Sequence, residues 1–252
     1  MCRMFGYVGS SYEDIGRLYE ALKMAARNDQ IAASIGHNPV HGDGWGCIIL
    51  DSTSRIMVEY HSGKAIFAPG EEMVFPKTTA NTVLYAIFHA RQASVKRTIN
   101  ATNSHPFCAS NRTDTLYLAQ NGALSREWTS RQPAYVQGRS VGSELALEFI
   151  VRRPTTFEGI AESTRELQNP TASALDLLIL KTEKKENKPS LLYKQFYKKN
   201  EAFYMLYRAE MAHGSAIVSS TLKEYGIDCR PVGRGTELTR LDAGAPRNKQ
   251  PF

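Results

Sequence analysis

The sequence predicts an α+β domain in which two β-sheets pack together and helices cover their outer faces. Strand-like apolar runs occupy the first and last parts of the chain, and two helical segments lie between them. An order of strands, then helices, then strands is typical of such layered domains. With 252 residues and 42% hydrophobic content, the chain is long enough to bury a sizeable core.

The first predicted element is a strand from about Arg3 to Val8, which leads into an amphipathic helix. Ser11 and Asp14 offer a capping box at the start of this helix. The apolar residues that follow recur at helical spacing, so one face of the helix is expected to be buried. They are Ile15, Leu18, Leu22 and Ala25 or Ala26.

Two helices are predicted in the middle of the chain, at "GSELALEFIVRR" and "TTFEGIAESTRELQN", and they are bounded by Pro154 and Pro170. Further strands are predicted on both sides of this helical pair. The runs before it are "HNPVHGDGWGCIILD" (a Gly-rich loop leading into a strand), "RIMVEYHSG", "TVLYAIFHARQAS" and "DTLYLAQNGAL". The runs after it are "ALDLLILKTE", "LLYKQFY", "EAFYMLYRAE" and "GSAIVSSTL". The segment "EAFYMLYRAE" has the propensity for a helix as well as for a strand.

No linker or repeat divides the chain, so a single domain is expected over residues 1–252, with residues 242–252 as a loose tail. No apolar run is long enough to span a membrane, and acidic residues arrive before any apolar stretch of the kind found in signal peptides. The four cysteines are scattered without metal-ligand spacing. We therefore expect free thiols, no metal or other cofactor, and a cytoplasmic location.

The net charge of +6, with a pI near 9.1, raises the alternative of a nucleic-acid-binding module. Much of the excess lies in "KTEKKENKPSLLYKQFYKKN", where glutamates are mixed with the lysines and a Lys-Pro turn interrupts the run. Such a segment predicts a solvated hairpin. No helix-turn-helix, RNA-binding or zinc-finger pattern supports nucleic-acid binding, so that alternative depends on charge alone.

Cys2 is a candidate nucleophile because it directly follows Met1. Methionine before a small residue is readily removed, which leaves an α-amine on the cysteine itself. The pKa of such an amine is about 7.7–8.0 and that of a thiol about 8.5, so the amine can accept the thiol proton near neutral pH. The alternative is an inert or redox-exposed cysteine.

Three other stretches contain residues that would complete such a site. Asn121 and Gly122, at a strand end, supply a side-chain amide and an accessible N–H for an oxyanion, although Asn-Gly is also a hairpin-turn signal. Arg91, at another strand end, is suited to a carboxylate, although a lone arginine usually lies at the surface. The loop "HGDGWG" would let the backbone approach a ligand closely. Its residues are His41, Gly42, Asp43, Gly44, Trp45 and Gly46.

Taken in order, these motifs resemble those of the class II glutamine amidotransferases, which are N-terminal-nucleophile hydrolases. The stretches that carry the resemblance are Cys2 with "RMFGYVG", then "HGDGWG", "FHARQAS", "NSHPFC", "YLAQNGAL" and "VGSE", with a looser match at "AIVSSTL". The likeness is closest to the stand-alone bacterial and archaeal group, which has no fused synthetase domain.

The resemblance implies a four-layer αββα sandwich and a role for each matching residue. Cys2, as the mature N-terminus, is similar to the nucleophile that forms a γ-glutamyl thioester with its own amine as base. Asn121 and Gly122 resemble the oxyanion hole, and Arg91 the residue that holds the α-carboxylate of glutamine. The loop residues His41, Asp43, Gly44 and Trp45 would support the site, and His105 would lie near the pocket as a packed histidine without a catalytic role.

One position departs from the family pattern. The family usually reads Thr-Asp-Ser-Glu where this chain reads "VGSE", so Gly142 replaces the aspartate that pairs with the α-ammonium of glutamine. An unpaired buried charge costs about 3–5 kcal/mol. Three explanations stay open: Glu144 reaches the ammonium, backbone carbonyls suffice, or the donor is a γ-glutamyl compound or another amide without a free ammonium there.

The resemblance implies an enzyme that cleaves the γ-amide of L-glutamine or of a γ-glutamyl compound. The ammonia would be released or passed to a separate acceptor or synthetase subunit, and neither nucleic acid nor a membrane is expected as a partner. The alternative, motivated by Gly142, is a catalytically weak glutamine-sensing or regulatory subunit.

Overall fold

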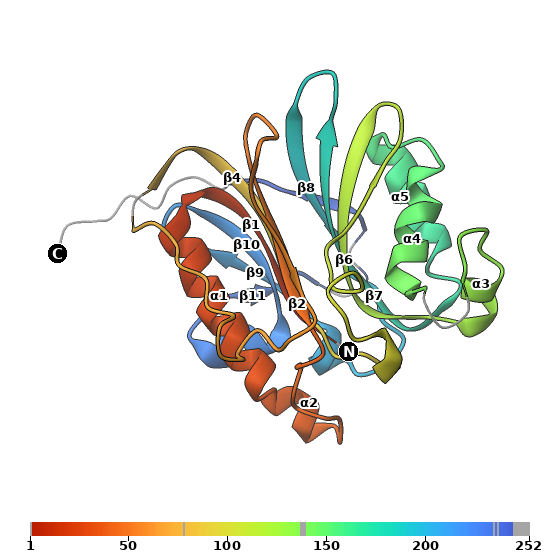
Figure 1. The fold of residues 1–252 in the computed structure, drawn as a ribbon, viewed down its shortest axis with the longest axis horizontal. Helices are drawn as coiled ribbons and strands as arrows, with labels where there is room; N and C mark the ends of the chain where they lie inside the picture. The colour runs from red at the N-terminus through yellow and green to blue at the C-terminus, as the bar shows by residue number, and fades with distance from the viewer. Residues whose placement is uncertain (1, 78, 137–139, 234, 236, 244–252) are drawn as a thin grey trace.

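The chain forms four layers in the order helix, sheet, sheet, helix (Figure 1). The structure is a computed structural model and describes residues 2–77, 79–136, 140–233, 235 and 237–243. In Figure 1 the helices α1 and α2 lie on one side of the paired sheets, and α4 and α5 lie on the other. The predicted α+β class and the αββα sandwich are therefore confirmed.

The first sheet has seven antiparallel strands in the order β11, β9, β10, β1, β4, β2, β3. They are β1 (Arg3–Ser11), β2 (Trp45–Asp51), β3 (Ile56–Ser62), β4 (Thr79–Ala90), β9 (Leu206–Glu210), β10 (Gly214–Ser219) and β11 (Arg230–Pro231). The strand β1 has hydrogen-bonded neighbours on both edges, β10 and β4. Because Cys2 directly precedes this central strand, the backbone around it is held on both sides.

The second sheet has five antiparallel strands in the order β12, β8, β7, β6, β5. They are β5 (Phe107–Ser110), β6 (Asp114–Leu124), β7 (Thr171–Glu183), β8 (Lys188–Lys194) and β12 (Thr239–Leu241). The long central pair β6 and β7 is in register from Asp114 opposite Glu183 to Gly122 opposite Leu175. The register shifts between Gly122 and Leu124, so a β-bulge interrupts the pairing before Leu124 pairs with Thr171.

The helices cover the outer faces of the two sheets. The helix α1 (Tyr12–Arg27) begins at Ser11, whose side chain accepts a hydrogen bond from the Asp14 N–H, and its predicted apolar face is buried against β1, β2 and β4. On the opposite side, α4 (Gly142–Val151) and α5 (Phe157–Glu166) pack on the five-stranded sheet. The shorter helices are α2 (Gln30–Ser34), α3 (Arg126–Ser130), α6 (Glu201–Tyr204) and the 3₁₀ helices η1 (Lys96–Thr98) and η2 (Ser220–Tyr225).

An apolar layer joins the two sheets. Met4 and Ile87 from the seven-stranded sheet pack in one buried cluster with Leu178 and Leu191 from the other. Gly6 leaves the space for this contact, since a Cβ there would lie only 2.9 Å from Leu191 Cδ2. Strand alternation places these residues on the inner faces of both sheets, and the site residues near Cys2 lie at one end of the same layer.

Most predicted elements are present at the expected positions. The ambiguous segment "EAFYMLYRAE" contains both structures, since α6 is followed directly by β9. The short strands β5, β11 and β12 were not predicted, because segments of two to four residues carry too little periodicity. Of the predicted tail, residues 244–252 lie outside the described residues.

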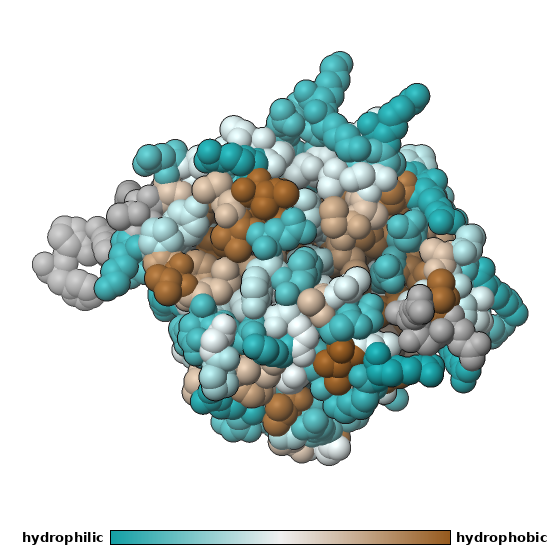
Figure 2. Space-filling view, in the orientation of Figure 1, coloured by the Kyte–Doolittle hydropathy of each residue, from teal (hydrophilic) through white to brown (hydrophobic). Residues whose placement is uncertain are grey.

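The basic segment "KTEKKENKPSLLYKQFYKKN" forms the β7–β8 hairpin and the chain that follows it. The tip of this hairpin, residues 184–187, is exposed and projects from the upper edge of the molecule in Figure 1, where Figure 2 shows a hydrophilic prong. The segment is thus a hairpin with a solvated tip, but the interpretation does not hold for all of it, since Lys181 and Lys194 are buried. Among the described residues, no helix combines the length and apolar character needed to cross a membrane.

We expect Leu178→Ala to lower the free energy of unfolding by about 2–5 kcal/mol, because it leaves a cavity between the sheets. Urea unfolding followed by circular dichroism measures the loss. Val74→Ala is the matched control, since Val74 is 94% exposed and its truncation should change the value by less than about 0.5 kcal/mol. Equal stabilities for the two variants would contradict the inter-sheet core.

Candidate active site

Cys2 and Asn121 come from different sheets and meet where the two sheets pack. The backbone nitrogen of Cys2 donates a hydrogen bond of 2.9 Å to Oδ1 of Asn121, and both residues are buried. Asn121 lies near the end of β6, and Cys2 lies just before β1. The two candidates are 119 residues apart in the chain, so the packing of the sheets brings them together.

A cavity of about 550 Å³ opens beside this contact. Its lining includes Cys2, Arg91 and Gly122, together with the start of α4. The lining also contains residues of the loop after β4 and of the segment after β6. The volume falls within the range of small-molecule sites, about 300–1,000 Å³. Three of the predicted site residues therefore share one cavity, and Asn121 lies directly beside it.

Gly122 occupies a position that no other residue fits. Its φ of +132° is in the region that favours glycine, and a Cβ would lie 1.9 Å from the carbonyl oxygen of Ala174 on β7. Asn121 and Gly122 lie within β6 rather than between two strands. The alternative interpretation of Asn-Gly as a hairpin turn is therefore wrong. The close approach to β7 holds the Gly122 backbone at the edge of the cavity.

The environment of the Cys2 thiol favours the thiolate. Burial is the largest single effect and raises its pKa, but the charge of His89, the N-terminal amine and hydrogen bonding to His89 and Gln92 together outweigh it, and the pKa falls to about 5. The sulfur lies 4.0 Å from the carbonyl oxygen of Gln92. His89 belongs to the "FHARQAS" stretch but was not singled out from the sequence. Its position two residues before Arg91 was the available signal, because alternate residues of a strand share a face.

Arg91 is held firmly at the end of β4. Its Nη1 and Nη2 donate hydrogen bonds of 2.8 Å to the carbonyl and hydroxyl oxygens of Thr98. The guanidinium has five N–H groups, so three are left for a ligand. Burial lowers the pKa of Arg91, an effect that the charges of Cys2 and Asp43 oppose. The interpretation of Arg91 as an ordinary surface residue is wrong, since only 4% of it is exposed.

The Gly-rich loop supports Arg91 through its backbone. The carbonyl of Gly44 accepts a hydrogen bond of 2.8 Å from the Arg91 N–H, and the Asp43 N–H donates one of 2.9 Å to the Arg91 carbonyl. The Asp43 carboxylate accepts from the Ala93 N–H at 2.9 Å and pairs with Lys96 at 3.0 Å. Gly44 has a φ of +120°, and a Cβ there would lie 2.4 Å from Ser104 Oγ.

His41 and Trp45 are the remaining two of the four loop residues expected to support the site. The Trp45 side chain packs in the core beneath α1, and its Nε1 donates a hydrogen bond of 2.8 Å to Glu71. His41 is fully buried and lies 2.7 Å from the Asp29 carboxylate. Neither residue lines the cavity. Their contribution to the site is therefore structural.

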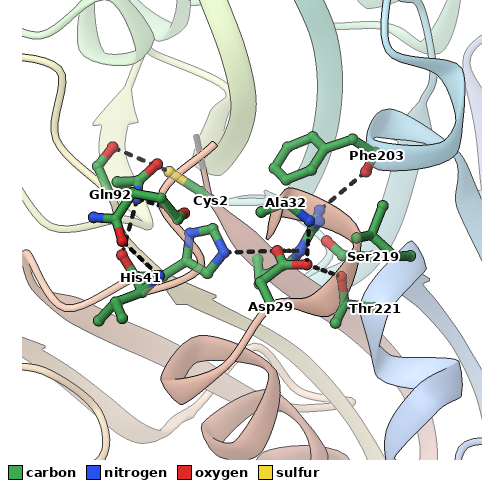
Figure 3. Close-up of polar contacts among 12 residues, drawn as sticks. Cys2, Asp29, Ala32, His41, Gln92, Phe203, Ser219 and Thr221 are labelled. Atoms are coloured by element: carbon green, nitrogen blue, oxygen red, sulfur yellow. Dashed lines mark hydrogen bonds and ion pairs between the residues drawn. The ribbon is translucent and has the colours of Figure 1, made fainter. Parts of the chain in front are cut away.

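Asp29 is the centre of a buried polar cluster that the sequence did not indicate (Figure 3). Its carboxylate accepts hydrogen bonds of 2.5 Å from Arg3 Nε and 2.6 Å from Thr221, besides the contact with His41. It also caps α2 by accepting from the Ala32 N–H at 3.0 Å. Burial raises the pKa of Asp29. The hydrogen bonds and the Arg3 charge together outweigh that effect, so the pKa lies well below its usual range.

Two more buried titratable groups adjoin the site. Asp176 lies opposite Asn121 on β7, and burial raises the pKa of its carboxyl well above the usual range. The ring of His105 packs 4.0 Å from that of His89 and 4.7 Å from that of Phe107, measured between centroids. Burial also lowers the pKa of His105 well below its ordinary value. The geometry agrees with the expectation of a packed, neutral histidine.

The start of α4 contributes Val141, Gly142 and Ser143 to the cavity lining. Glu144 follows directly in the helix but does not line the cavity. The first explanation for the missing aspartate, in which Glu144 reaches the substrate, therefore has no support from this geometry. Among the described residues, no cluster of His, Cys, Asp or Glu side chains could hold a metal ion.

No protein-family model matches the chain, and no curated protein sequence matches it. Among solved structures, the chain is similar to "the allosteric regulatory enzyme of purine biosynthesis", with a TM-score of 0.61 and 17% identity, over 96% of this chain and 50% of that one. The chain thus spans about half the length of that enzyme. It also aligns with a "predicted glutamine amidotransferase from Pseudomonas aeruginosa", with a TM-score of 0.48 and 16% identity, over 98% and 95% of the two chains.

At this level of identity, the first similarity establishes the fold. The chain therefore shares its fold with that enzyme, and in this chain Cys2 directly precedes the central strand β1. The predicted resemblance to class II amidotransferases is confirmed at this level. The reaction has to be argued from the site itself.

We expect the alkylation of Cys2 by iodoacetamide to have a midpoint near pH 5, because the thiolate is the reactive form and the pKa is about 5. The rate of adduct formation, followed by peptide mass spectrometry, measures this midpoint. His89→Gln should move it upward, towards or beyond the ordinary thiol value. Cys108 is the internal control, since burial raises the pKa of its thiol. A Cys2 midpoint above pH 8 would contradict the His89 interaction.

We expect Asp29→Ala to lower the free energy of unfolding at pH 7 by about 3–5 kcal/mol, because it leaves Arg3 buried without its partner. The depressed pKa of Asp29 means that its stabilisation is present above about pH 4 and is lost as the pH falls below that value. Urea unfolding at pH 7 and at pH 3 should therefore show a smaller difference between variant and wild type at pH 3. Asp228→Asn, at an exposed position, is the control; an equal loss for both variants would disprove the role of Asp29.

Proposed function

We propose that the protein is an amidohydrolase of the class II glutamine amidotransferase type, acting in the cytoplasm as a single domain. It cleaves the γ-amide of L-glutamine or of a γ-glutamyl compound through a thioester on Cys2. The observation that carries this proposal is the 2.9 Å hydrogen bond between the Cys2 nitrogen and Asn121, beside a cavity that Cys2, Gly122 and Arg91 line.

The first step requires Cys2 to be the mature N-terminus. Its backbone nitrogen is then an α-amine whose reference pKa, about 7.7–8.0, is higher than the thiol pKa of about 5. At neutral pH the proton therefore stays on the amine and the sulfur is a thiolate. Asn121 Oδ1 accepts a hydrogen bond from that nitrogen and orients it towards the cavity.

The thiolate attacks the amide carbon, a C–S bond forms and the carbonyl oxygen becomes an oxyanion. The Asn121 side-chain amide and the Gly122 N–H are the candidate donors to this oxygen. The ammonium proton of Cys2 passes to the leaving nitrogen, the C–N bond breaks and ammonia departs. Water then attacks the thioester and the C–S bond breaks; one proton of the water returns to the Cys2 amine and the other goes to solvent, so the carboxylate product leaves with the thiolate and the ammonium restored.

Arg91 is the candidate anchor for the substrate α-carboxylate. Its guanidinium lines the cavity with Cys2, and two of its N–H groups are already fixed by Thr98. A planar guanidinium held in this way is pre-organised for a bidentate carboxylate. The ammonia is released to water or is used by a separate acceptor subunit.

The second candidate function is a glutamine-sensing subunit that binds the amide without efficient turnover. The observation that favours it is the cavity lining, which contains no carboxylate among the described residues to pair with an amino-acid ammonium. Calorimetry with glutamine separates the two functions when it is combined with mass spectrometry of Cys2. Binding without any Cys2 adduct supports the sensor, and a labile glutamyl adduct supports the enzyme.

We expect Cys2→Ala to abolish ammonia release from glutamine and γ-glutamyl amides, and Asn121→Ala to reduce kcat by about 10²–10³-fold. A coupled assay for ammonia measures both, and intact-mass analysis of the wild type should show a chain without Met1. Cys108→Ala is the matched control, since its thiol lies away from the cavity. A form with an uncleavable N-terminal tag should be inactive. Equal turnover by the wild type, Cys2→Ala and the tagged form would disprove the mechanism.

A further inference from the structure

The charged side chains that line the cavity in the described part of the chain are, apart from the Cys2 thiolate, all cationic. They are Arg91, Arg97 and Arg126, which come from β4, η1 and α3 or their ends. Arg91 is buried, whereas Arg97 and Arg126 are exposed and have no carboxylate partner among the described residues. Three guanidinium groups around one cavity produce a positive potential that attracts anions.

Asp43, Glu144 and Glu127, three carboxylates around the site, do not line the cavity. Asp43 is already paired with Lys96 and with the Ala93 N–H, and it does not line the cavity. Glu144 follows two lining residues of α4 but is itself absent from the lining. Glu127, beside Arg126, pairs instead with Arg131 at 2.7 Å. A substrate in the cavity therefore meets three guanidinium groups and no lining carboxylate among the described residues.

Gly142 adds to this charge asymmetry because it provides no side chain at the cavity wall. It is the first residue of α4, whose preceding residue, Val141, makes no side-chain capping bond. The wall at this point consists of peptide groups at a helix start, where the partial charge is positive. An ammonium ion on a substrate would be repelled here, whereas a neutral or anionic group would not.

We propose that the donor amide carries no ammonium group: it is the monoamide of a five-carbon dicarboxylic acid whose α-carbon bears a neutral substituent or none. This inference rests on the proposed function and specifies its substrate. The amide carbon lies at Cys2, the distal carboxylate binds Arg91, and Arg97 and Arg126 attract the anion towards the open cavity. L-Glutamine presents the same amide and carboxylate but places an unpaired cation among the arginines.

The test compares three amides of equal length with the native enzyme: glutaramate, N-acetyl-L-glutamine and L-glutamine. Each releases ammonia by the same bond cleavage, so kcat/KM reports the environment of the α-carbon. Glutaramate and N-acetyl-L-glutamine should exceed L-glutamine by about tenfold or more, which is the scale of a like-charge contact in a partly solvated site.

The variant Gly142→Asp tests whether the missing carboxylate is the cause. A Cβ at Gly142 would contact only Thr129 Cγ2, at 3.7 Å, so the site has room for the side chain. This variant should shift the kcat/KM ratio of L-glutamine to glutaramate upward by about tenfold or more, since a single carboxylate at contact distance suffices for that shift. Gly142→Asn is the matched control, because it has the same shape without the charge and should leave the ratio near its wild-type value.

The outcomes distinguish this inference from the proposed function. A wild-type enzyme that prefers L-glutamine, or that cleaves all three amides equally, overturns the substrate inference and leaves the amidohydrolase intact. An equal shift in Gly142→Asp and Gly142→Asn overturns the charge argument. If no amide yields ammonia or a Cys2 adduct, the proposed function fails and the substrate inference fails with it.

Discussion

The buried ion pair between Arg3 and Asp29 is the interaction on which the position of Cys2, the proposed nucleophile, depends. Asp29 receives hydrogen bonds from Arg3, His41 and Thr221 and also caps α2. Arg3 further donates to the Phe203 carbonyl and stacks 3.7 Å from the Phe203 ring. Because both charges are out of water, neither can move without losing several partners. The residue directly after Cys2 is therefore fixed in direction as well as in position.

The two sheets contribute different parts of the candidate site. The seven-stranded sheet places Cys2, His89 and Arg91 at the ends of β1 and β4, and the five-stranded sheet places Asn121 and Gly122 in β6. The apolar layer between the sheets holds these groups in position relative to one another. The geometry of the candidate site therefore depends on side chains of this layer as well as on the site residues themselves. Burial of the thiol, the largest single effect on its pKa, is opposed by the charge of His89, the N-terminal amine and hydrogen bonding, which together favour the thiolate.

The cavity has a different character from the core that supports it. The core beneath α1 and the inter-sheet layer are apolar and closely packed, whereas loops and helix ends around the cavity supply guanidinium, hydroxyl and peptide groups. In the proposed enzyme, strands would hold the reacting groups and the connecting segments would set which substrate is accepted. The positive lining and Gly142 belong to these connecting segments and to the start of α4.

The sequence by itself determined the elements and the candidate nucleophile, because these depend on local information. Periodicity predicted α1 with its Ser11 cap and the long strands, and the ordered motifs identified Cys2, Arg91, Asn121 and Gly122. Only the tertiary structure decided that Asn-Gly is not a turn, that Trp45 belongs to the core, and that Glu144 lies outside the cavity lining. It also revealed His89 and Asp29, whose roles come from partners distant in the chain, such as Thr221, which is 192 residues from Asp29. Local patterns encode backbone geometry and burial, whereas the partners of a buried charge are set only when distant strands pack together.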